Sequence, residues 1–290
     1  MLKMMLKTIV NFGLYSTLVR FFWGLKTTYL RRSKRYFQIE VHITEHCNLK
    51  CRGCSHFSPL ADEVILAPES FEHDCARLAK ITTKLVTIKL LGGEPLLHPQ
   101  LAGFFEIARK YFKTTVIQLT TNGILLSRQP DSFWTACHKY KIYVEISDYP
   151  VNIDVKAISA KCKKYRVCVG YTVSKENGMN KMAMDLEGAQ DPEINFALCG
   201  LGYSGGCVTL RDGKIYVCPT AGHIQFFNKY FNKDLRITEK DYIDIYKIKN
   251  KNEILDFLHK PFPFCRYCKP SASLNGLSWE VSRKKVSEWT

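Results

Sequence analysis

Three cysteines lie close together near the start of the chain, in the segment Cys47-Asn48-Leu49-Lys50-Cys51-Arg52-Gly53-Cys54. Their spacing is C-x3-C-x2-C, and cysteine thiolates are the ligands of iron–sulfur clusters. A [4Fe-4S] cluster normally takes four cysteines, so this loop would leave one iron without a protein ligand. An open iron can bind and activate a small molecule, whereas a fully ligated cluster mostly transfers electrons. The loop therefore predicts a cluster that takes part in chemistry.

Three clustered cysteines could also hold zinc, with His42, His46 or His56 as a fourth ligand. Zinc sites more often show two spaced cysteine pairs, and they do not predict the segment Gly92-Gly93-Glu94-Pro95. That segment follows the apolar run 85–91, which is typical of a strand. Gly-Gly and Pro are also common loop residues, but the position at a strand end favours a role in a site.

With both motifs in place, residues 37–171 resemble the radical S-adenosylmethionine (radical SAM) superfamily. The resemblance implies that the open iron chelates SAM, and that the reduced cluster cleaves it to a 5'-deoxyadenosyl radical that abstracts a hydrogen atom from a substrate. It also implies which residues contact SAM, and these are Gly92, Gly93, Glu94, Pro95, Asn122 and Ser147. Turn formation is the alternative role for Asn122 and Ser147. Gly53 departs from the family, in which an aromatic residue often precedes the third cysteine.

Short apolar or β-branched runs alternate with helical ones after residue 36. Strands are expected at 36–43, 85–91, 115–120, 141–147 and 165–172, and helices at 68–83, 99–112, 130–140 and 153–164. This alternation predicts an α/β fold with a parallel sheet, and the resemblance makes it a partial (β/α)6 TIM-like barrel. The cysteine loop, the GGEP segment, Asn122 and Ser147 all follow predicted strands, where barrels carry their chemistry. Glu145, Asp148 and Tyr149 are candidates for acid–base roles by position alone.

Five further cysteines follow the predicted barrel. The interval from Cys199 through Gly213 to Cys218 resembles the signature of the twitch and SPASM extensions of radical SAM enzymes, and Asp212-Gly213 is a good hairpin turn. The resemblance implies a second, auxiliary [4Fe-4S] cluster, and the ligands we expect are Cys199, Cys218, Cys265 and Cys268. Cys207 competes with Cys199 for the first position, and four thiolates would equally make a structural zinc site. The remaining cysteines, which lack ligand spacing, are expected in the core: Cys75, Cys137, Cys162 and Cys168.

The chain has 290 residues and a formal net charge of +15. Residues 1–37 contain eight basic and no acidic side chains, with apolar residues close to helical spacing. Such a basic amphipathic helix could lie on an anionic membrane or dock on the enzyme body. It is too interrupted for a clean membrane span, and it lacks a recognisable nucleic-acid module. We expect three parts: this N-terminal helix at 1–36, the radical SAM core at 37–195, and an auxiliary-cluster extension of a β-hairpin and helix at 196–290.

The function predicted from these observations is that of a radical SAM enzyme with two clusters. The basic charge favours an anionic substrate, such as a nucleotide, a sugar phosphate or an acidic peptide. The resemblance implies a small-molecule or peptide substrate and a reductant such as a flavodoxin or ferredoxin. Clustered cysteines in a chain of this length fit a reducing, cytoplasmic compartment, with peripheral membrane contact as an added role of the N-terminal helix. The alternatives are a non-catalytic iron–sulfur or zinc protein that binds a partner or membrane, and a radical methyltransferase, which the missing cobalamin domain disfavours.

Overall fold

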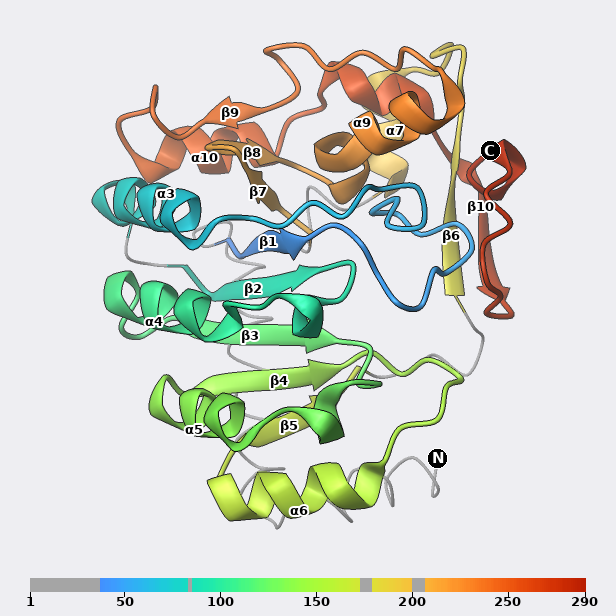
Figure 1. Cartoon of the computed structure of the whole chain (residues 1–290). Helices are drawn as coiled ribbons and strands as arrows, with labels where there is room; N and C mark the ends of the chain where they lie inside the picture. The colour runs from blue at the N-terminus through green and yellow to red at the C-terminus, as the bar shows by residue number, and fades with distance from the viewer. Residues whose placement is uncertain (1–36, 83–84, 173–178, 200–206) are drawn as a thin grey trace.

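The computed structural model describes residues 37–82, 85–172, 179–199 and 207–290. A large, mostly parallel sheet carries helices across one face, and a two-stranded sheet stands beside it (Figure 1). The predicted α/β class is therefore confirmed. Among the described residues, no helix is both long enough and apolar enough to cross a membrane. The basic helix predicted at 1–36 lies outside the described residues.

Strands and helices alternate along the first half of the chain as β1 (Ile39–Thr44), α3 (Pro68–Ile81), β2 (Thr87–Gly92), α4 (Leu101–Tyr111), β3 (Val116–Thr121), α5 (Asp131–Lys139), β4 (Ile142–Ile146), α6 (Val155–Tyr165) and β5 (Cys168–Tyr171). The second half contains β6 (Met179–Met184), α7 (Pro192–Cys199), β7 (Thr209–Arg211), β8 (Lys214–Tyr216), α9 (Pro219–Phe231), β9 (Ile243–Asp244), α10 (Lys251–Leu258) and β10 (Cys268–Leu277). Short 3-10 helices are η1 (Pro95–Leu97), η2 (Leu126–Arg128), η3 (Pro263–Tyr267) and η4 (Val286–Glu288).

Two of the helices begin at residues that are typical of a helix start. Pro68 and the acidic Glu69 lie in the first turn of α3, as predicted. The Asp154 side chain accepts a hydrogen bond from the Ala157 N–H and caps α6. These local signals explain why the observed helix bounds lie within about two residues of the expected ones.

The large sheet has the strand order β5-β4-β3-β2-β1-β7-β8-β9. Strands β1 to β5 are parallel to their neighbours, so their C-terminal ends meet at one edge of the sheet. This edge receives the cysteine loop after β1, the GGEP segment after β2, Asn122 after β3 and Ser147 after β4. The prediction that these segments share one edge is therefore confirmed.

Within the described residues the large sheet does not close into a barrel. Its sixth parallel strand, β7, does not lie beside β5, where a (β/α)6 barrel would place it. β7 pairs in parallel with β1 through Glu40 and Thr209, on the side of the sheet away from β5. The strand that follows β5 along the chain is β6, and it pairs with β10 in the separate antiparallel sheet. β7 has only three residues, and its place beside β1 depends on a long-range backbone bond from the Glu40 N–H to the Val208 oxygen of 2.7 Å. No local pattern encodes such a pairing.

The predicted hairpin at the start of the extension is confirmed. β7 and β8 pair antiparallel, and the turn residues Asp212 and Gly213 have φ of 50° and 70°, which suits a tight hairpin. The hairpin continues the large sheet, so this part of the predicted 196–290 unit shares its hydrogen bonds with the core. The division at residue 195 stays a prediction.

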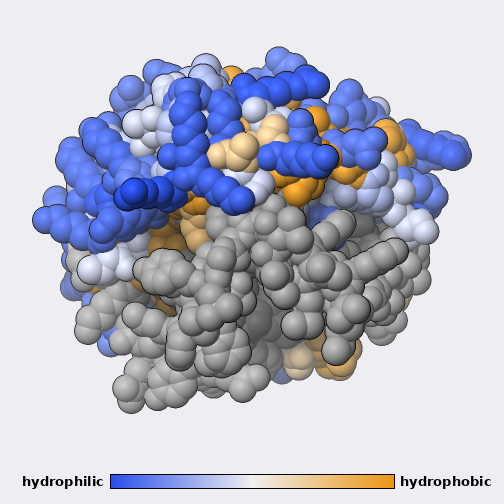
Figure 2. Space-filling model, turned by 90° about the horizontal axis from the view of Figure 1, so that it is seen from below, coloured by the Kyte–Doolittle hydropathy of each residue, from blue (hydrophilic) through white to orange (hydrophobic). Residues whose placement is uncertain are grey.

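Each strand of the parallel sheet presents an apolar and a polar face. The apolar side chains, which pack with residues of α3, α4 and α5 in one core, are Ile39, Val41, Ile88, Leu90, Ile117, Leu119, Ile142 and Val144. Their neighbours in sequence, on the face away from these helices, are Glu40, His42, Lys89, Gln118, Thr120, Tyr143 and Glu145. The outer surface of the described residues is mainly hydrophilic when the molecule is seen from below (Figure 2).

Candidate functional site

The three clustered cysteines lie just beyond the C-terminal end of β1. Cys51 is buried, whereas Cys47 and Cys54 are half-buried. The backbone between them is left-handed at Lys50, with φ of 51°, and at Gly53, with φ of 64°, so the loop curls around the cysteines. Each of the three thiols interacts electrostatically with the others. The structure therefore brings the three predicted ligands together.

The surroundings of these thiols disfavour their ionisation in the metal-free protein. Burial, together with the neighbouring thiols, raises the pKa of Cys47 to about 11 and that of Cys51 to about 12. N–H groups oppose this: Leu49 N–H donates to Cys47 Sγ at 3.4 Å, and the Trp279 indole N–H donates to Cys51 Sγ at 3.1 Å. A bound metal removes the remaining cost, because the cation deprotonates coordinating thiols and holds them as thiolates. The donor set fits an iron–sulfur cluster on these grounds.

The chain returns to this loop close to its last residue. In the segment 279–289, the Glu280 carbonyl accepts the Arg52 N–H at 2.9 Å, and the two side chains form an exposed ion pair. The Trp289 indole N–H donates to the Cys54 carbonyl at 2.9 Å, with its ring almost fully buried. Sequence reasoning missed this segment, because nothing local in it points to a partner at the other end of the chain.

Glu94 fastens the GGEP segment to the end of β3. Its carboxylate is fully buried and accepts hydrogen bonds from Leu96 N–H at 3.1 Å, Thr121 Oγ1 at 2.6 Å and Asn122 N–H at 2.8 Å. Burial raises the pKa of Glu94 to about 7 despite these donors. The carboxylate is therefore a structural anchor first, and contact with a SAM ammonium stays a prediction.

The two glycines of this segment were expected to contact SAM, but the structure shows a different reason for glycine at these positions. A Cβ on Gly92, whose φ is +152°, would lie 2.0 Å from the Thr44 carbonyl oxygen, and one on Gly93 would lie 2.0 Å from the His46 oxygen. Glycine is therefore required by the close packing of the end of β2 against the end of β1. Pro95 then starts η1 and is buried. Backbone contact of these residues with a cosubstrate stays a prediction.

Asn122 reaches toward the cysteine loop. Its amide donates to Asn48 Oδ1 at 2.7 Å and lies 3.9 Å from Cys47 Sγ. Ser147, at the end of β4, is tied to β3 because its N–H donates to the Thr121 oxygen at 2.8 Å. Asn122 thus lies beside the predicted cluster, while Ser147 lies two strands from β2 along the same edge. Tyr149, a candidate by position, lies close enough to the Cys51 thiol to lower the pKa of that thiol.

A buried ionic cluster beside the loop was not found by sequence reasoning. Glu45 accepts from Arg211 Nη1 at 2.6 Å and from His42 Nδ1 at 3.0 Å, and the His223 ring stacks on His42 at 3.8 Å. Burial alone would raise the pKa of Glu45, but His42 and Arg211 hold it below its usual range. Burial lowers the pKa of His56 and His223 well below the ordinary value, so both rings are neutral. The sequence signal that could have pointed to this cluster is the alternation in β1, where the polar Glu40 and His42 lie between apolar residues.

This cluster also meets the distance criterion for a metal, since His42, Glu45 and His223 place potential ligand atoms within 4.8 Å of one another. Arg211 already neutralises Glu45, however, and lies 2.9 Å from His223 Nδ1. The guanidinium thus bonds to Glu45 Oε1 and His223 Nδ1, whereas His42 Nε2 and His223 Nε2 have no hydrogen-bond partner among the described residues. The cluster is best described as a neutralised polar core that joins β1, β7 and α9.

The four predicted auxiliary ligands line one small cavity: Cys199, Cys218, Cys265 and Cys268. They come from the end of α7, the start of α9, η3 and the start of β10, and they interact electrostatically. Cys207 does not line this cavity, so the geometry favours Cys199 as the first ligand. Of the predicted core cysteines, Cys75, Cys137 and Cys162 are buried, whereas Cys168 is half-buried.

Two features prepare this cavity for thiolates. Cys218 is the N-cap of α9, and its sulfur accepts the Ala221 N–H at 3.5 Å, so the positive end of the helix faces it. Asn195, buried in α7 one turn before Cys199, donates its amide to the Cys265 carbonyl at 2.8 Å and to the Cys268 carbonyl. Asn195 fixes the C-x2-C pair against α7, and sequence reasoning did not identify it.

The comparisons with known proteins agree with this arrangement. Residues 41–175 match the family model of the Radical SAM superfamily. GTP 3',8-cyclase of Aliarcobacter butzleri is 34% identical over 109 residues, which are 37% of this chain and 30% of that protein. The Molybdenum cofactor biosynthesis protein 1 of Dictyostelium discoideum is 31% identical over 107 residues, which are 35% of this chain and 16% of that protein.

Among solved structures, BtrN in complex with AdoMet and 2-DOIA aligns with a TM-score of 0.51 at 14% identity, covering 81% of this chain and 93% of that one. At this identity the likeness shows a shared fold. The chain spans about 30% of the length of the first curated relatives it matches.

Proposed function

We propose that this chain, of which residues 41–175 match the Radical SAM superfamily model, is an enzyme that cleaves S-adenosylmethionine reductively and abstracts a hydrogen atom from a polar substrate. The observation that carries the proposal is the convergence of Cys47, Cys51 and Cys54 at the C-terminal end of β1, next to the GGEP segment. When bound, a [4Fe-4S] cluster with one open iron would supply the electron and the site for SAM.

The protein's own contribution is to hold the cluster and to position the GGEP segment beside it. Cys47, Cys51 and Cys54 would hold three irons, and the N–H donors from Leu49 and Trp279 would stabilise the sulfur charge. Glu94 keeps the ends of β2 and β3 in fixed register, which orients the GGEP backbone beside the loop. Gly92, Gly93, Glu94, Pro95, Asn122 and Ser147 remain our candidates for contacts with SAM.

We propose that the four-cysteine cavity holds an auxiliary [4Fe-4S] cluster. Cys199, Cys218, Cys265 and Cys268 line this cavity and interact electrostatically, and four cysteine thiolates are the usual ligands of a [4Fe-4S] cluster. A structural zinc site takes the same four ligands, and metal analysis distinguishes the two. The twitch-like form, with one auxiliary cluster, follows from the four available ligands.

The substrate is expected over the polar face of the sheet. Glu40 and Lys89 form a partly buried ion pair at 3.1 Å, and Gln118 donates to Glu145 at 2.6 Å. These side chains project from adjacent strands on the face away from the helices. A face with both acidic and basic groups suits a small molecule or peptide segment rich in hydrogen-bonding groups. The relatives' substrate, GTP, is one member of that class, and a reductant such as a flavodoxin or ferredoxin would complete the system.

The deciding experiment is an assay of 5'-deoxyadenosine release. The full chain is reconstituted anaerobically with iron and sulfide, reduced with dithionite and given SAM. We expect release from the wild type, loss of release in Cys51→Ala, and retained release in Cys75→Ala, which removes a buried thiol of the core. Release that persists in Cys51→Ala refutes the proposal. A protein with intact clusters that binds SAM without cleaving it would support a non-catalytic binding role.

Iron content tests the auxiliary cluster. Two [4Fe-4S] clusters give about eight irons per chain, and the double variant Cys265→Ala/Cys268→Ala should fall to about four while the SAM-binding cluster remains. If the wild type instead contains one equivalent of zinc and the double variant contains none, the auxiliary site is a structural zinc site and not an iron–sulfur cluster.

A further inference from the structure

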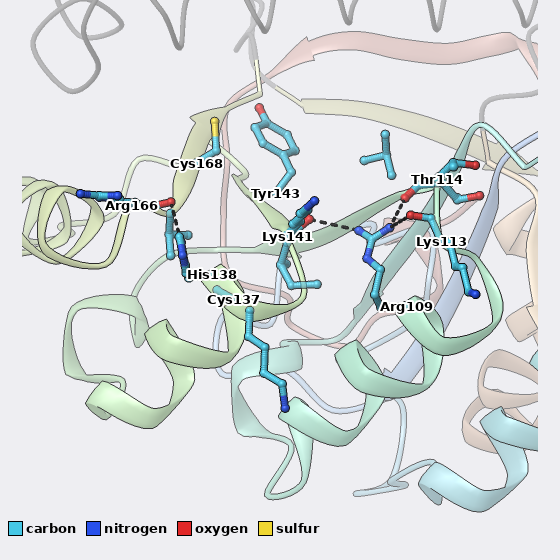
Figure 3. A pocket seen from close by; sticks show the side chains of 14 residues that line it. Arg109, Lys113, Thr114, Cys137, His138, Lys141, Tyr143, Arg166 and Cys168 are labelled. Atoms are coloured by element: carbon cyan, nitrogen blue, oxygen red, sulfur yellow. Dashed lines mark hydrogen bonds between the residues drawn. The ribbon is translucent and has the colours of Figure 1, made fainter.

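A second site lies at the opposite edge of the sheet from the cysteine loop. A cavity of about 620 Å³ opens where β3, β4 and β5 begin and where α4 and α5 end (Figure 3). This volume lies within the range of small-molecule sites. The chain enters the strands here through left-handed residues, Lys141 with φ of 54° and Arg166 with φ of 55°.

Arg109 makes the cavity wall rigid. Its guanidinium donates to backbone carbonyls of two connections: to Tyr140 at 2.9 Å between α5 and β4, and to Lys113 at 3.0 Å and Thr115 at 2.9 Å between α4 and β3. All of these acceptors are neutral, so the guanidinium charge is hydrogen-bonded but not cancelled by a carboxylate among the lining residues. The wall therefore carries a fixed positive charge before any ligand arrives.

The lining as a whole is basic. Its cationic side chains are Arg109, Lys113, Lys139, Lys141 and Arg166, and no Asp or Glu belongs to it. The C-terminal ends of α4, α5 and α6 oppose this charge with about half an elementary charge each. Arg166 and Lys113 point away from the centre of the lining in Figure 3, whereas Arg109 and Lys141 lie near it, and these two formal positive charges still exceed that sum of about one and a half negative charges. The cavity therefore keeps a positive potential, which a low-dielectric hollow concentrates.

The same cavity has an apolar part. Val116, Ile142 and Val167 line it, and the Tyr143 ring stands above Lys141 (Figure 3). In that view, the Lys141 ammonium lies in the middle of the lining, between Arg109 and Tyr143. A ligand would thus meet positive charge on one side and an aromatic and aliphatic surface on the other.

We propose that this cavity binds a phosphate ester with an apolar or aromatic body. A dianionic phosphate matches the two central cations, Arg109 and Lys141, better than a single negative charge does. The apolar lining residues would pack against the apolar or aromatic part of the ester. The site is separate from the predicted cluster and its binding does not depend on SAM chemistry, so it can be tested whether or not the proposed function holds.

The probe is 1-naphthyl phosphate, with neutral 1-naphthol as its uncharged counterpart, titrated into the full chain by calorimetry. We expect one binding event for the phosphate, weakened at least about tenfold in Lys141→Glu and weakened by added salt. Lys156→Glu is the matched control, because Lys156 is exposed in α6 and does not line the cavity. Circular dichroism confirms that each variant is folded.

Competition then separates the two sources of such a ligand. Displacement of 1-naphthyl phosphate by phosphatidylglycerol vesicles, but not by phosphatidylcholine vesicles, identifies a lipid headgroup as the phosphate ester. Lack of displacement by either vesicle identifies a soluble ester. The proposal is overturned if the folded wild type does not bind 1-naphthyl phosphate, if 1-naphthol binds equally well, or if Lys141→Glu and Lys156→Glu weaken binding to the same extent.

Discussion

Trp279 offers the sharpest test of how the late part of the chain acts on the predicted cluster. Its indole N–H donates to Cys51 Sγ at 3.1 Å. Hydrogen bonds to cluster sulfurs raise the reduction potential, because they stabilise the more negative, reduced form. Replacing Trp279 by Phe keeps an aromatic ring and removes the donor. We therefore expect the reduction potential of the SAM-binding cluster to fall.

The size of the shift follows from the bond. A hydrogen bond to a charged group contributes about 1.5–3 kcal/mol. If about half of this differs between the two redox states, the difference is about 0.75–1.5 kcal/mol. For a one-electron couple, about 1.4 kcal/mol corresponds to 59 mV, so the potential should fall by about 30–60 mV. The measurement is an anaerobic redox titration followed by electron paramagnetic resonance.

Trp289→Phe is the matched control. Trp289 donates to the Cys54 carbonyl and not to a sulfur, and it packs against Phe57 and Phe227 in the core. This variant should lower the melting temperature while leaving the reduction potential nearly unchanged. Trp279→Phe, in contrast, should lower the reduction potential while leaving the melting temperature nearly unchanged. A Trp279→Phe protein with full iron content and the wild-type potential would refute the reasoning, as would equal shifts in both variants.

Three further predictions concern the supporting residues. Asn195→Ala leaves the Cys265 and Cys268 carbonyls without their donor, so the unfolding free energy should fall by about 1–3 kcal/mol and iron should be lost from the auxiliary site first, as iron analysis and calorimetry would show; unchanged iron content counts against this role. Gly93→Ala places a methyl group against the His46 oxygen and should prevent cluster assembly, whereas Gly103→Ala meets nothing within 4 Å and should stabilise α4 by about 0.5–1 kcal/mol; equal effects on iron loading and melting temperature would contradict the packing argument. Burial lowers the pKa of His98, whose Nε2–H donates to Leu66 O while Nδ1 accepts from Gln100 N–H, so its contribution to stability is full above the unfolded pKa of about 6.5 and falls by up to about 1.4 kcal/mol per pH unit below it; His98→Gln should flatten the acid side of the stability profile, and an unchanged slope would refute this.

Sequence reasoning located most of the architecture that carries the site. The strand–helix alternation from β1 to β5 follows from side-chain periodicity and helix caps, which are local properties. Parallel strands bring their C-terminal ends together, so the loop at Cys47 and the segment at Gly92 could be placed at one edge from the order of the elements alone. The gathering of Cys199, Cys218, Cys265 and Cys268 was also anticipated, although through a family resemblance.

The parts that were missed depend on contacts between distant segments. β7 beside β1, Trp279 on Cys51 and Asn195 on the C-x2-C pair are each set by packing of the whole chain, and their local sequences carry no corresponding signal. Gly92 and Gly93 show a subtler case. Their positions were predicted correctly, but the physical demand on them comes from the backbone of β1, which only the three-dimensional arrangement reveals.

The two indoles that hold the cysteine loop lie 228 and 235 positions beyond their partners. While the chain is being made on the ribosome, β1 and its loop emerge long before Trp279 and Trp289 do. In that interval Cys51 lacks its N–H donor and Arg52 lacks the backbone acceptor from Glu280. An iron–sulfur assembly system that reached the nascent chain would find only an unfinished binding loop. Cluster insertion is therefore expected to follow the synthesis of the segment 279–289 and its docking on the loop.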